Sequence, residues 1–239
     1  MNLLKRTSVL TIVLWTLTII CMVLTLKSSD EPVLGLFINT PIETIFGQFA
    51  SGNSIIFNVS IGFLVSIIFY ILVVWIPDKR RKNIIKHNIE EQYRFFKEDT
   101  IHILLSACSV GSYDSNSPSK LSDQNEFRKY FKENISASQN RWHAVFNGLE
   151  GYLLRELLVE LEILLNEVTF VLNNVYINDQ NVFSFFKRLS YSVYKLKNTT
   201  SEYDDLKRLA SFLWELFAGW SMIDGYRDEE IVKVMISKI

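Results

Sequence analysis

The side chains of this chain best suited to acid–base or metal chemistry are three histidines and two cysteines, His87, His102, His143, Cys21 and Cys108. Imidazole is the usual general acid or base near neutral pH, and imidazole and thiolate are the usual zinc ligands. None of the five lies in an H-E-x-x-H or C-x-x-C pattern, and the sequence holds no G-x-S-x-G or G-x-x-x-x-G-K-[ST] motif. We therefore expect no catalytic, cofactor-binding or metal site, and a protein that is not an enzyme.

One spacing fits a known nuclease pattern: Arg81 and His87 are separated by five residues in RKNIIKH. This resembles the relaxed Arg-x4–6-His motif of the HEPN ribonucleases, which are also all-helical, and the resemblance implies cleavage of RNA. The same run holds Lys79, Arg80 and Lys82 directly after an apolar segment, where basic side chains contact anionic lipid headgroups. It has no interleaved aromatic residues, so direct nucleic-acid binding is not supported. Membrane contact is the first interpretation, and a membrane-tethered ribonuclease stays an alternative.

Small polar residues recur at helical spacings inside two otherwise apolar segments. One set repeats every seven residues with a cysteine between, and the other repeats every four: Thr11, Thr18, Cys21 and Thr25, then Asn58, Gly62 and Ser66. Each spacing places its residues on one face of a helix. Such faces either pack helices closely or line a water-filled path in an oligomer. Ser60 lies about 160° from Gly62, at ~100° per residue, so we expect it to tolerate a large side chain.

The segments that carry these faces, residues 8–26 and 55–76, contain no charged side chain. Each is about as long as the ~20 helical residues that cross a bilayer. No small-x-small cleavage site follows the first segment, so it is expected to remain as an anchor rather than be removed as a signal peptide. The sequence therefore predicts an N-terminal transmembrane hairpin over residues 1–76.

The charges that flank the two segments predict their orientation. Basic residues precede the first segment and follow the second, whereas the connecting loop 27–54 holds one lysine against three acidic residues. Positive flanks stay in the cytoplasm, so both termini and residues 77–239 are expected inside the cell. Frequent Asn, Ile and Lys residues are typical of AT-rich bacterial genes, so the expected membrane is the bacterial inner membrane. The expected contacts with the bilayer surface are Lys5, Arg6, Trp75, Lys79, Arg80, Arg81 and Lys82. In the loop, a capping-box pattern predicts a short amphipathic helix over residues 41–50.

Residues 77–239 show helical periodicity and no strand alternation, so the fold class is an all-α membrane protein with a cytoplasmic helical bundle. Helices are expected over about 77–109, 124–133 and 138–175, the last broken or kinked near Gly148 and Gly151. Asp179, Ser201 and Asp228 are expected to cap three more helices. Residues 110–123 are expected to form a polar linker.

Two spans followed by a compact cytoplasmic helical domain are similar in layout to the two-transmembrane effectors of bacterial anti-phage defence systems, the retron-associated ones among them. The resemblance implies that a cytoplasmic signal switches the membrane part into a permeabilising state. A two-helix hairpin cannot enclose a pathway alone, so the expected protein is a homo-oligomer with a cytoplasmic protein partner encoded by a neighbouring gene. A membrane-anchored adaptor that recruits a soluble partner is the alternative from another class.

Overall fold

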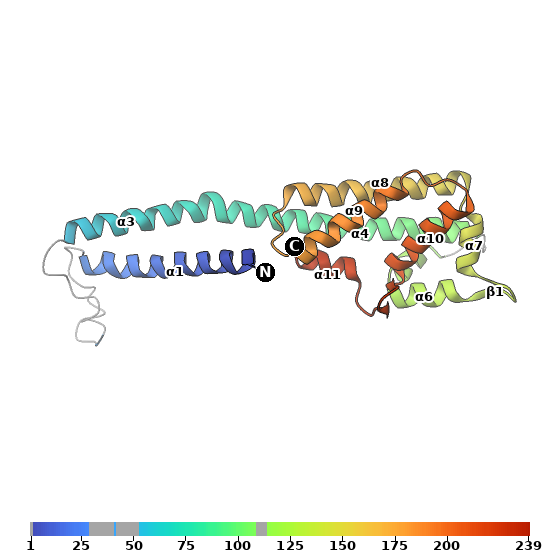
Figure 1. The fold of residues 1–239 in the computed structure, drawn as a ribbon, viewed down its shortest axis with the longest axis horizontal. Coiled ribbons are helices and arrows are strands. Elements are labelled where there is room, and N and C mark those ends of the chain that lie inside the picture. Colours follow the sequence, from blue (N-terminus) through green and yellow to red (C-terminus); the bar gives the residue numbers. More distant parts are fainter. Residues whose placement is uncertain (1, 29–40, 42–52, 109–113) are drawn as a thin grey trace. The chain divides into compact units, whose positions relative to one another are not determined.

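The structure of the protein, a computed structural model, describes residues 2–28, 41, 53–108 and 114–239, with side chains from Thr11 onward except that of Asn53. The chain divides into two compact units, Met1–Arg81 and Lys82–Ile239. Among the described residues both units are built of helices, with two short strand pairs in the second (Figure 1). The all-α prediction is therefore confirmed. The helix predicted over 41–50 lies, apart from Pro41, outside the described residues.

The first unit pairs α1, Asn2–Ser28, with α3, Asn53–Tyr70. The π-helical segment η2, Ile71–Trp75, follows α3 and leads without a non-helical residue into α4, Ile76–Ala107. In η2 the backbone N–H of Ile76 donates to the carbonyl of Ile71, five residues back. Both α1 and the helical run that starts at α3 are long and apolar enough to cross a membrane.

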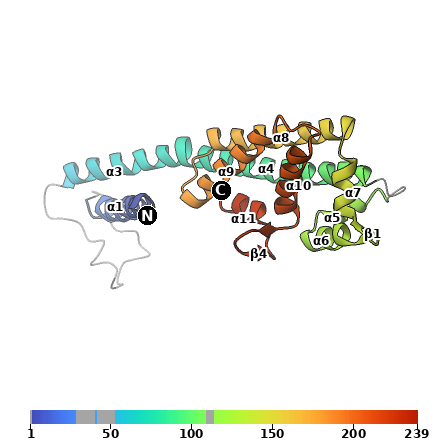
Figure 2. The same cartoon turned by 45° about the vertical axis from the view of Figure 1, so that its right-hand side comes forward.

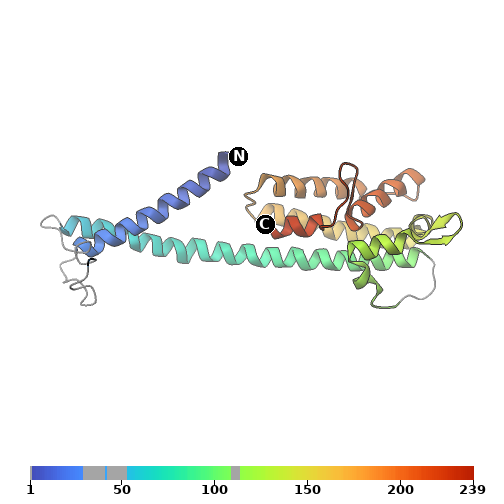
Figure 3. The same ribbon diagram turned by 90° about the horizontal axis from the view of Figure 1, so that it is seen from below.

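The second unit packs seven further helices around the part of α4 beyond Arg81. Their bounds are α5 Ser117–Leu121, α6 Gln124–Lys132, α7 Arg141–Gly148, α8 Gly151–Asn174, α9 Gln180–Leu196, α10 Tyr203–Phe217 and α11 Ile231–Ser237. Helix α8 runs back along α4, and α9 packs against α8 (Figures 1 and 3). Helices α5, α6 and α7 gather near the C-terminal end of α4 (Figure 2).

Apolar periodicity explains which face of each helix is buried. On α4, Ile85, Ile89 and Phe96 fall on one face of the helix and are buried. On α8, Leu157 and Leu161 are almost completely buried, and each such side chain stabilises the fold by roughly 1.5–3 kcal/mol. Aromatic rings fill the other end of the core, where the ring centroids of Phe96 and Phe217 lie 5.8 Å apart, and those of Phe127 and Phe217 5.5 Å apart.

The predicted break in the run 138–175 is confirmed, since α7 ends at Gly148 and α8 begins at Gly151. A side chain at Gly148 would meet the carbonyl oxygen of Ala107, so α7 and α4 approach closely only because this residue is glycine. Gly151 has φ of 54°, a left-handed conformation that glycine adopts without strain. The missing side chain at Gly148 and the left-handed backbone at Gly151 therefore allow the chain to break between α7 and α8.

One of the three predicted caps is confirmed and two are wrong. The Asp179 carboxylate accepts from the backbone N–H of Asn181 at 2.8 Å and starts α9. Helix α10 starts after Glu202 instead of Ser201, because Thr200 bonds Asp205 through both its backbone N–H and its hydroxyl and thereby ties the turn. Helix α11 starts after Glu230, two residues beyond Asp228.

Two short strand pairs and one short helix were not predicted. Strands β1, Asn134–Ser136, and β2, Gln139–Asn140, are antiparallel, as are β3, Trp220–Ser221, and β4, Gly225–Tyr226. Strands of two or three residues are too short to show alternation. Helix α5 lies inside the segment predicted as linker, with Pro118 in its first turn, so that prediction is wrong for residues 117–121.

Candidate functional site

The structure places the two polar faces of the hairpin differently. Thr18 and Thr25 are half-buried and Cys21 is buried in the contact between α1 and α3, while Thr11 is exposed. The residue of α3 buried there is Ser60, whose exposure is 3%, and the expectation that it tolerates a large side chain is therefore wrong. The physical reason is that Ser60 is small enough to let the two helices approach closely. The helical spacing of small residues on α3 does not show which side of the helix meets α1.

The other face, formed by Asn58, Gly62 and Ser66, is exposed and does not meet the stripe on α1. A side chain built at Gly62 would touch nothing within 4 Å. The Asn58 amide has no hydrogen-bond partner among the described residues. A polar amide in lipid requires a partner, so this face is incomplete in a single copy of a membrane-inserted chain.

The hydroxyl groups of Thr18, Thr25 and Ser66 are satisfied within their own helices. Thr18 donates to the carbonyl of Leu14 at 2.8 Å, and Thr25 donates to that of Cys21 at 2.8 Å. Ser66 likewise donates to the carbonyl of Gly62 at 2.9 Å. Such bonds to the carbonyl four residues back let hydroxyl groups lie in lipid without water. Asn58 therefore differs from the hydroxyl-bearing residues of these faces.

Of the seven residues expected at the membrane surface, five lie in η2 and the start of α4, and two lie in α1. Trp75 is exposed, and the Lys79 Nζ lies 4.9 Å from its ring centroid. Arg80 and Arg81 are exposed and Lys82 is half-buried. Lys5 and Arg6 lie in α1, with side chains outside the described part. An indole with a cation over it suits the boundary between lipid and water.

Arg81 and His87 lie on the same helix but on different faces. Six positions along α4 correspond to about 120° of rotation at ~100° per residue. The Nε2 of His87 instead lies 3.8 Å from the Glu91 carboxylate, and both side chains are exposed. Among the described residues no three or more His, Cys, Asp or Glu side chains are grouped so that they could hold a metal ion. The helix therefore does not bring the two residues of the nuclease-like pattern together.

A buried ion pair in the second unit was missed at the sequence level. The exposure of Lys97 is 2%, and its Nζ lies 3.0 Å from the Glu230 carboxylate and donates to the carbonyl of Ser122. Burial lowers the pKa of Lys97, against the opposing effect of Glu230. Burial and the charge of Glu230 raise the pKa of Tyr93 well above its usual value. Lys97 lies one turn after Tyr93 on the apolar face of α4. A lysine on an apolar face was the feature of the sequence that could have indicated a buried charge.

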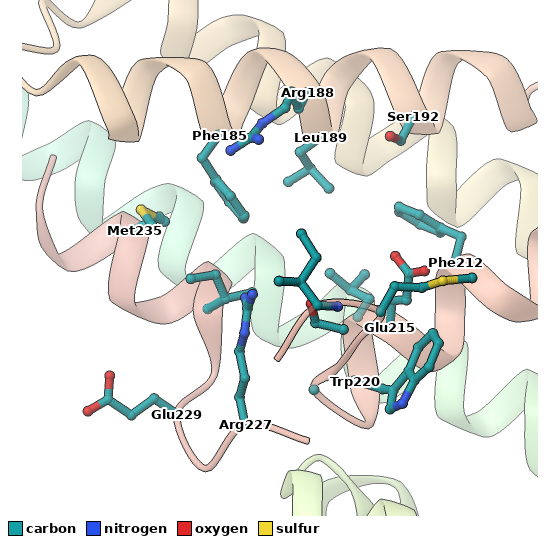
Figure 4. A pocket seen from close by; sticks show the side chains of 16 residues that line it. Phe185, Arg188, Leu189, Ser192, Phe212, Glu215, Trp220, Arg227, Glu229 and Met235 are labelled. Carbon is teal, nitrogen blue, oxygen red and sulfur yellow. The ribbon is translucent and has the colours of Figure 1, made fainter. Parts of the chain in front are cut away.

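A cavity of about 550 Å³ opens between α9, α10, α11 and the β3–β4 hairpin (Figure 4). Its walls are mostly apolar, and Phe185, Arg188 and Arg227 extend into it from two sides (Figure 4). Arg227 pairs with Asp224 at 2.5 Å, and burial raises the pKa of Glu215 on the opposite wall. Charges of both signs border this cavity, so it carries no clear preference for one class of ligand.

Comparison of the chain with protein-family models, with curated proteins and with solved structures finds no match in any of the three.

Proposed function

We propose that this protein is a homo-oligomeric effector of the bacterial inner membrane, in which the cytoplasmic unit senses a protein partner or signal and the hairpin then permeabilises the bilayer. The proposed setting is abortive anti-phage defence. The observation that carries the proposal is the exposed face of Asn58, Gly62 and Ser66 on an otherwise uncharged helix. In lipid this face is complete only when another polar surface covers it.

A second copy of the hairpin is the occupant that fits this face. Gly62 leaves room for close approach of a neighbouring helix, and Asn58 supplies an amide that can donate and accept across a helix–helix contact. Several copies arranged with these faces inward would enclose a path lined by amide and hydroxyl groups. With the same faces packed tightly together, the path would be closed.

The surface of α8 supports association of copies in the cytoplasmic unit. Four exposed large apolar side chains, Tyr152, Val159, Ile163 and Phe170, fall within about 40° of one another around the helix at ~100° per residue. Together they form a stripe along most of α8. Exposed apolar stripes of this length on soluble surfaces mark interaction sites.

The helical path from α3 through η2 to α4 supports communication between sensing and permeation. No residue from Asn53 to Ala107 is non-helical, and the buried part of α4 carries Lys97 and its ion pair with Glu230. A partner that repacks α11 against α4 would act on a helix that continues into the span. Rotation or tilt of that helix would move Asn58 and Ser66 between packed and water-facing positions.

Membrane potential in cells that express the protein with its neighbouring genes and receive the trigger tests the proposal. A potential-sensitive dye should report depolarisation for the natural chain. Asn58→Leu with Ser66→Leu should abolish it, while Val59→Leu with Val65→Leu, also exposed on α3, should not. An intact potential with a soluble protein co-purifying would favour the adaptor. An intact potential with RNA cleavage lost in Arg81→Ala/His87→Ala would favour the ribonuclease.

A further inference from the structure

All three tryptophans of the second unit line one cavity of about 310 Å³. Trp142 comes from α7, Trp214 from α10 and Trp220 from β3, and each is half-buried. The ring centroids of Trp142 and Trp214 lie 5.0 Å apart with 52° between their planes. The remaining two tryptophans of the chain, Trp15 and Trp75, belong to the first unit. Large indole surfaces thus converge on a hollow instead of filling the core completely.

A fourth aromatic side chain stands at the edge of this cavity. Tyr203 is 66% exposed, and its ring meets Phe146 edge to face with centroids 5.3 Å apart. Residues of α7, α10 and β3 therefore provide aromatic walls that are open to solvent on one side. Flat aromatic walls of this kind stack against planar rings.

The position of Trp220 depends on the residue before it. Gly219 has φ of 62°, and a side chain there would come within 2.7 Å of the buried Gln124 amide. The chain therefore turns tightly over Gln124 and delivers Trp220 to the cavity wall. The backbone turn at Gly219 therefore holds Trp220 in the cavity wall.

Apart from the Tyr203 phenol, the ionisable side chains that line the cavity are basic. They are Lys207 and His143, and no carboxylate lines it. Among the described residues, Lys207 makes no ion pair or hydrogen bond. An aromatic cage alone would attract a cation, but an unpaired lysine at its wall repels one and attracts an anion. The cavity therefore differs from the neighbouring one, which Glu215 and Glu229 also line.

We propose that this cavity binds a small molecule consisting of a planar aromatic ring that carries an anionic group. The ring stacks on the indoles of Trp214 and Trp220 with the Tyr203 ring against it at the open edge, and the anion contacts the Lys207 ammonium, with the His143 imidazole as a second donor. A volume of about 310 Å³ suits one fused ring system with the anion near the mouth. The site is independent of the permeation proposal, because it requires only the fold of the second unit.

Three probes separate the ring from the anion: adenosine 5′-monophosphate, adenosine and ribose 5-phosphate. The full-length protein is used in detergent with Trp15→Phe and Trp75→Phe, so that its tryptophan emission comes from the cavity alone. Calorimetry and fluorescence should show the monophosphate binding at least about tenfold more tightly than either fragment, since stacking and an ion contact each contribute about that factor. Equal affinity for the monophosphate and one fragment, or no binding of any probe at about 10 mM, overturns the proposal.

Two substitutions locate the binding, each with a matched control. Lys207→Gln should weaken monophosphate binding about tenfold and leave adenosine unchanged, whereas Lys129→Gln, an exposed lysine on α6, should change neither. Tyr203→Ala should weaken both ring-bearing probes roughly fivefold or more, whereas Tyr194→Ala, 65% exposed on α9, should not. Circular dichroism checks that each variant is folded. Unchanged affinity in folded Lys207→Gln and Tyr203→Ala places any observed binding elsewhere and overturns the assignment.

Discussion

The Nζ of Lys97 lies 3.0 Å from a carboxylate oxygen of Glu230, 133 residues further along the chain. Lys97 belongs to the middle of α4, and Glu230 immediately precedes α11. A second lysine, Lys233, approaches the other oxygen of Glu230 at 2.9 Å from the first turn of α11. The pair therefore fixes the start of α11 to α4, the helix that continues from α3 and η2. The packing of α11 is the natural place to test.

Breaking the pair from either side should have unequal effects on stability. Glu230→Gln leaves a buried ammonium without its carboxylate and should lower the free energy of unfolding by about 3 kcal/mol. Lys97→Met removes the buried charge, keeps most of the side-chain volume and leaves Glu230 with Lys233, so it should cost clearly less. Chemical denaturation of the detergent-solubilised protein measures both, with Glu229→Gln as control. A larger loss for Lys97→Met than for Glu230→Gln would contradict this account.

Tyr93 should make the second unit sensitive to alkaline pH. Burial raises the pKa of its hydroxyl above the ordinary value of 10.0. The folded state then keeps the proton where the unfolded state releases it, so the stabilisation is complete below pH 10 and is lost progressively above it. Tyr93→Phe should flatten this loss, with little effect at pH 7. Thermal unfolding measured at several pH values checks this, and a Tyr93→Phe curve with the same alkaline slope as the natural chain would rule it out.

Ser60 and Gly62 should respond differently to leucine. Ser60→Leu overpacks the contact between α1 and α3 and should destabilise the hairpin by about 1–3 kcal/mol. Gly62→Leu fits within a single chain, where nothing lies within 4 Å, but should block close approach of a second copy. Chemical cross-linking in membranes should therefore show loss of oligomers for Gly62→Leu, and limited proteolysis should show loosening for Ser60→Leu. The opposite assignment of the two phenotypes would place the interface between copies on the Ser60 face.

The exposed stripe of α8 should contribute to association of the chains. Val159→Glu with Ile163→Glu places two charges in the middle of the stripe and should weaken association at least about tenfold, because a charge buried at an interface is costly. Thr169→Glu, also exposed on α8, serves as the control. Light scattering of the detergent-solubilised protein measures the mass of the assembly. An unchanged mass for the double variant would remove this surface from the interface.

The orientation of the hairpin should be visible with a membrane-impermeant maleimide. A cysteine at Ser51 should react in intact cells and one at Ser117 should not, because the positively charged flanks predict that residues 77–239 lie inside the cell. The natural cysteines give a low background. Both are buried, and burial raises the pKa of Cys108 to about 11, which leaves little reactive thiolate at neutral pH. Labelling of Ser117→Cys but not of the cysteine at position 51 would show that the orientation is the opposite of the predicted one.

The longer helices of the second unit could be predicted because each carries an apolar face, as α8 does with Leu157 and Leu161, whereas the five-residue α5 could not. The starting residues of α10 and α11 were less predictable: Ser201 and Asp228 are residue types that often cap helices, but α10 starts after Glu202 and α11 after Glu230. The ion pair of Lys97 joins residues far apart in the sequence, so periodicity shows only that a lysine lies on an apolar face. The tryptophan-lined cavity was equally hidden, because Trp142 on α7 is separated from Trp214 on α10 and Trp220 on β3 by two intervening helices, α8 and α9.

The choice between Ser60 and Gly62 shows a second reason why the sequence alone did not predict how α1 and α3 pack. Helical spacing gives the angle between two small residues but not the direction in which the partner helix lies. Composition favoured the face with Asn58 and Ser66 as the packed one, whereas α1 lies against Ser60. Which of the two faces of α3 is packed depends on the side on which α1 lies.

The π-helical segment η2 affects how the chain can be cut and rejoined. A turn closed by a bond from Ile76 to Ile71 holds one residue more than an α-helical turn. Side-chain faces counted along α3 at 3.6 residues per turn are therefore out of phase with those of α4. A fusion that replaces α1 and α3 by another helix must keep residues 71–75 or drop one of them. Otherwise the grafted helix is turned by about 100° relative to the start of α4.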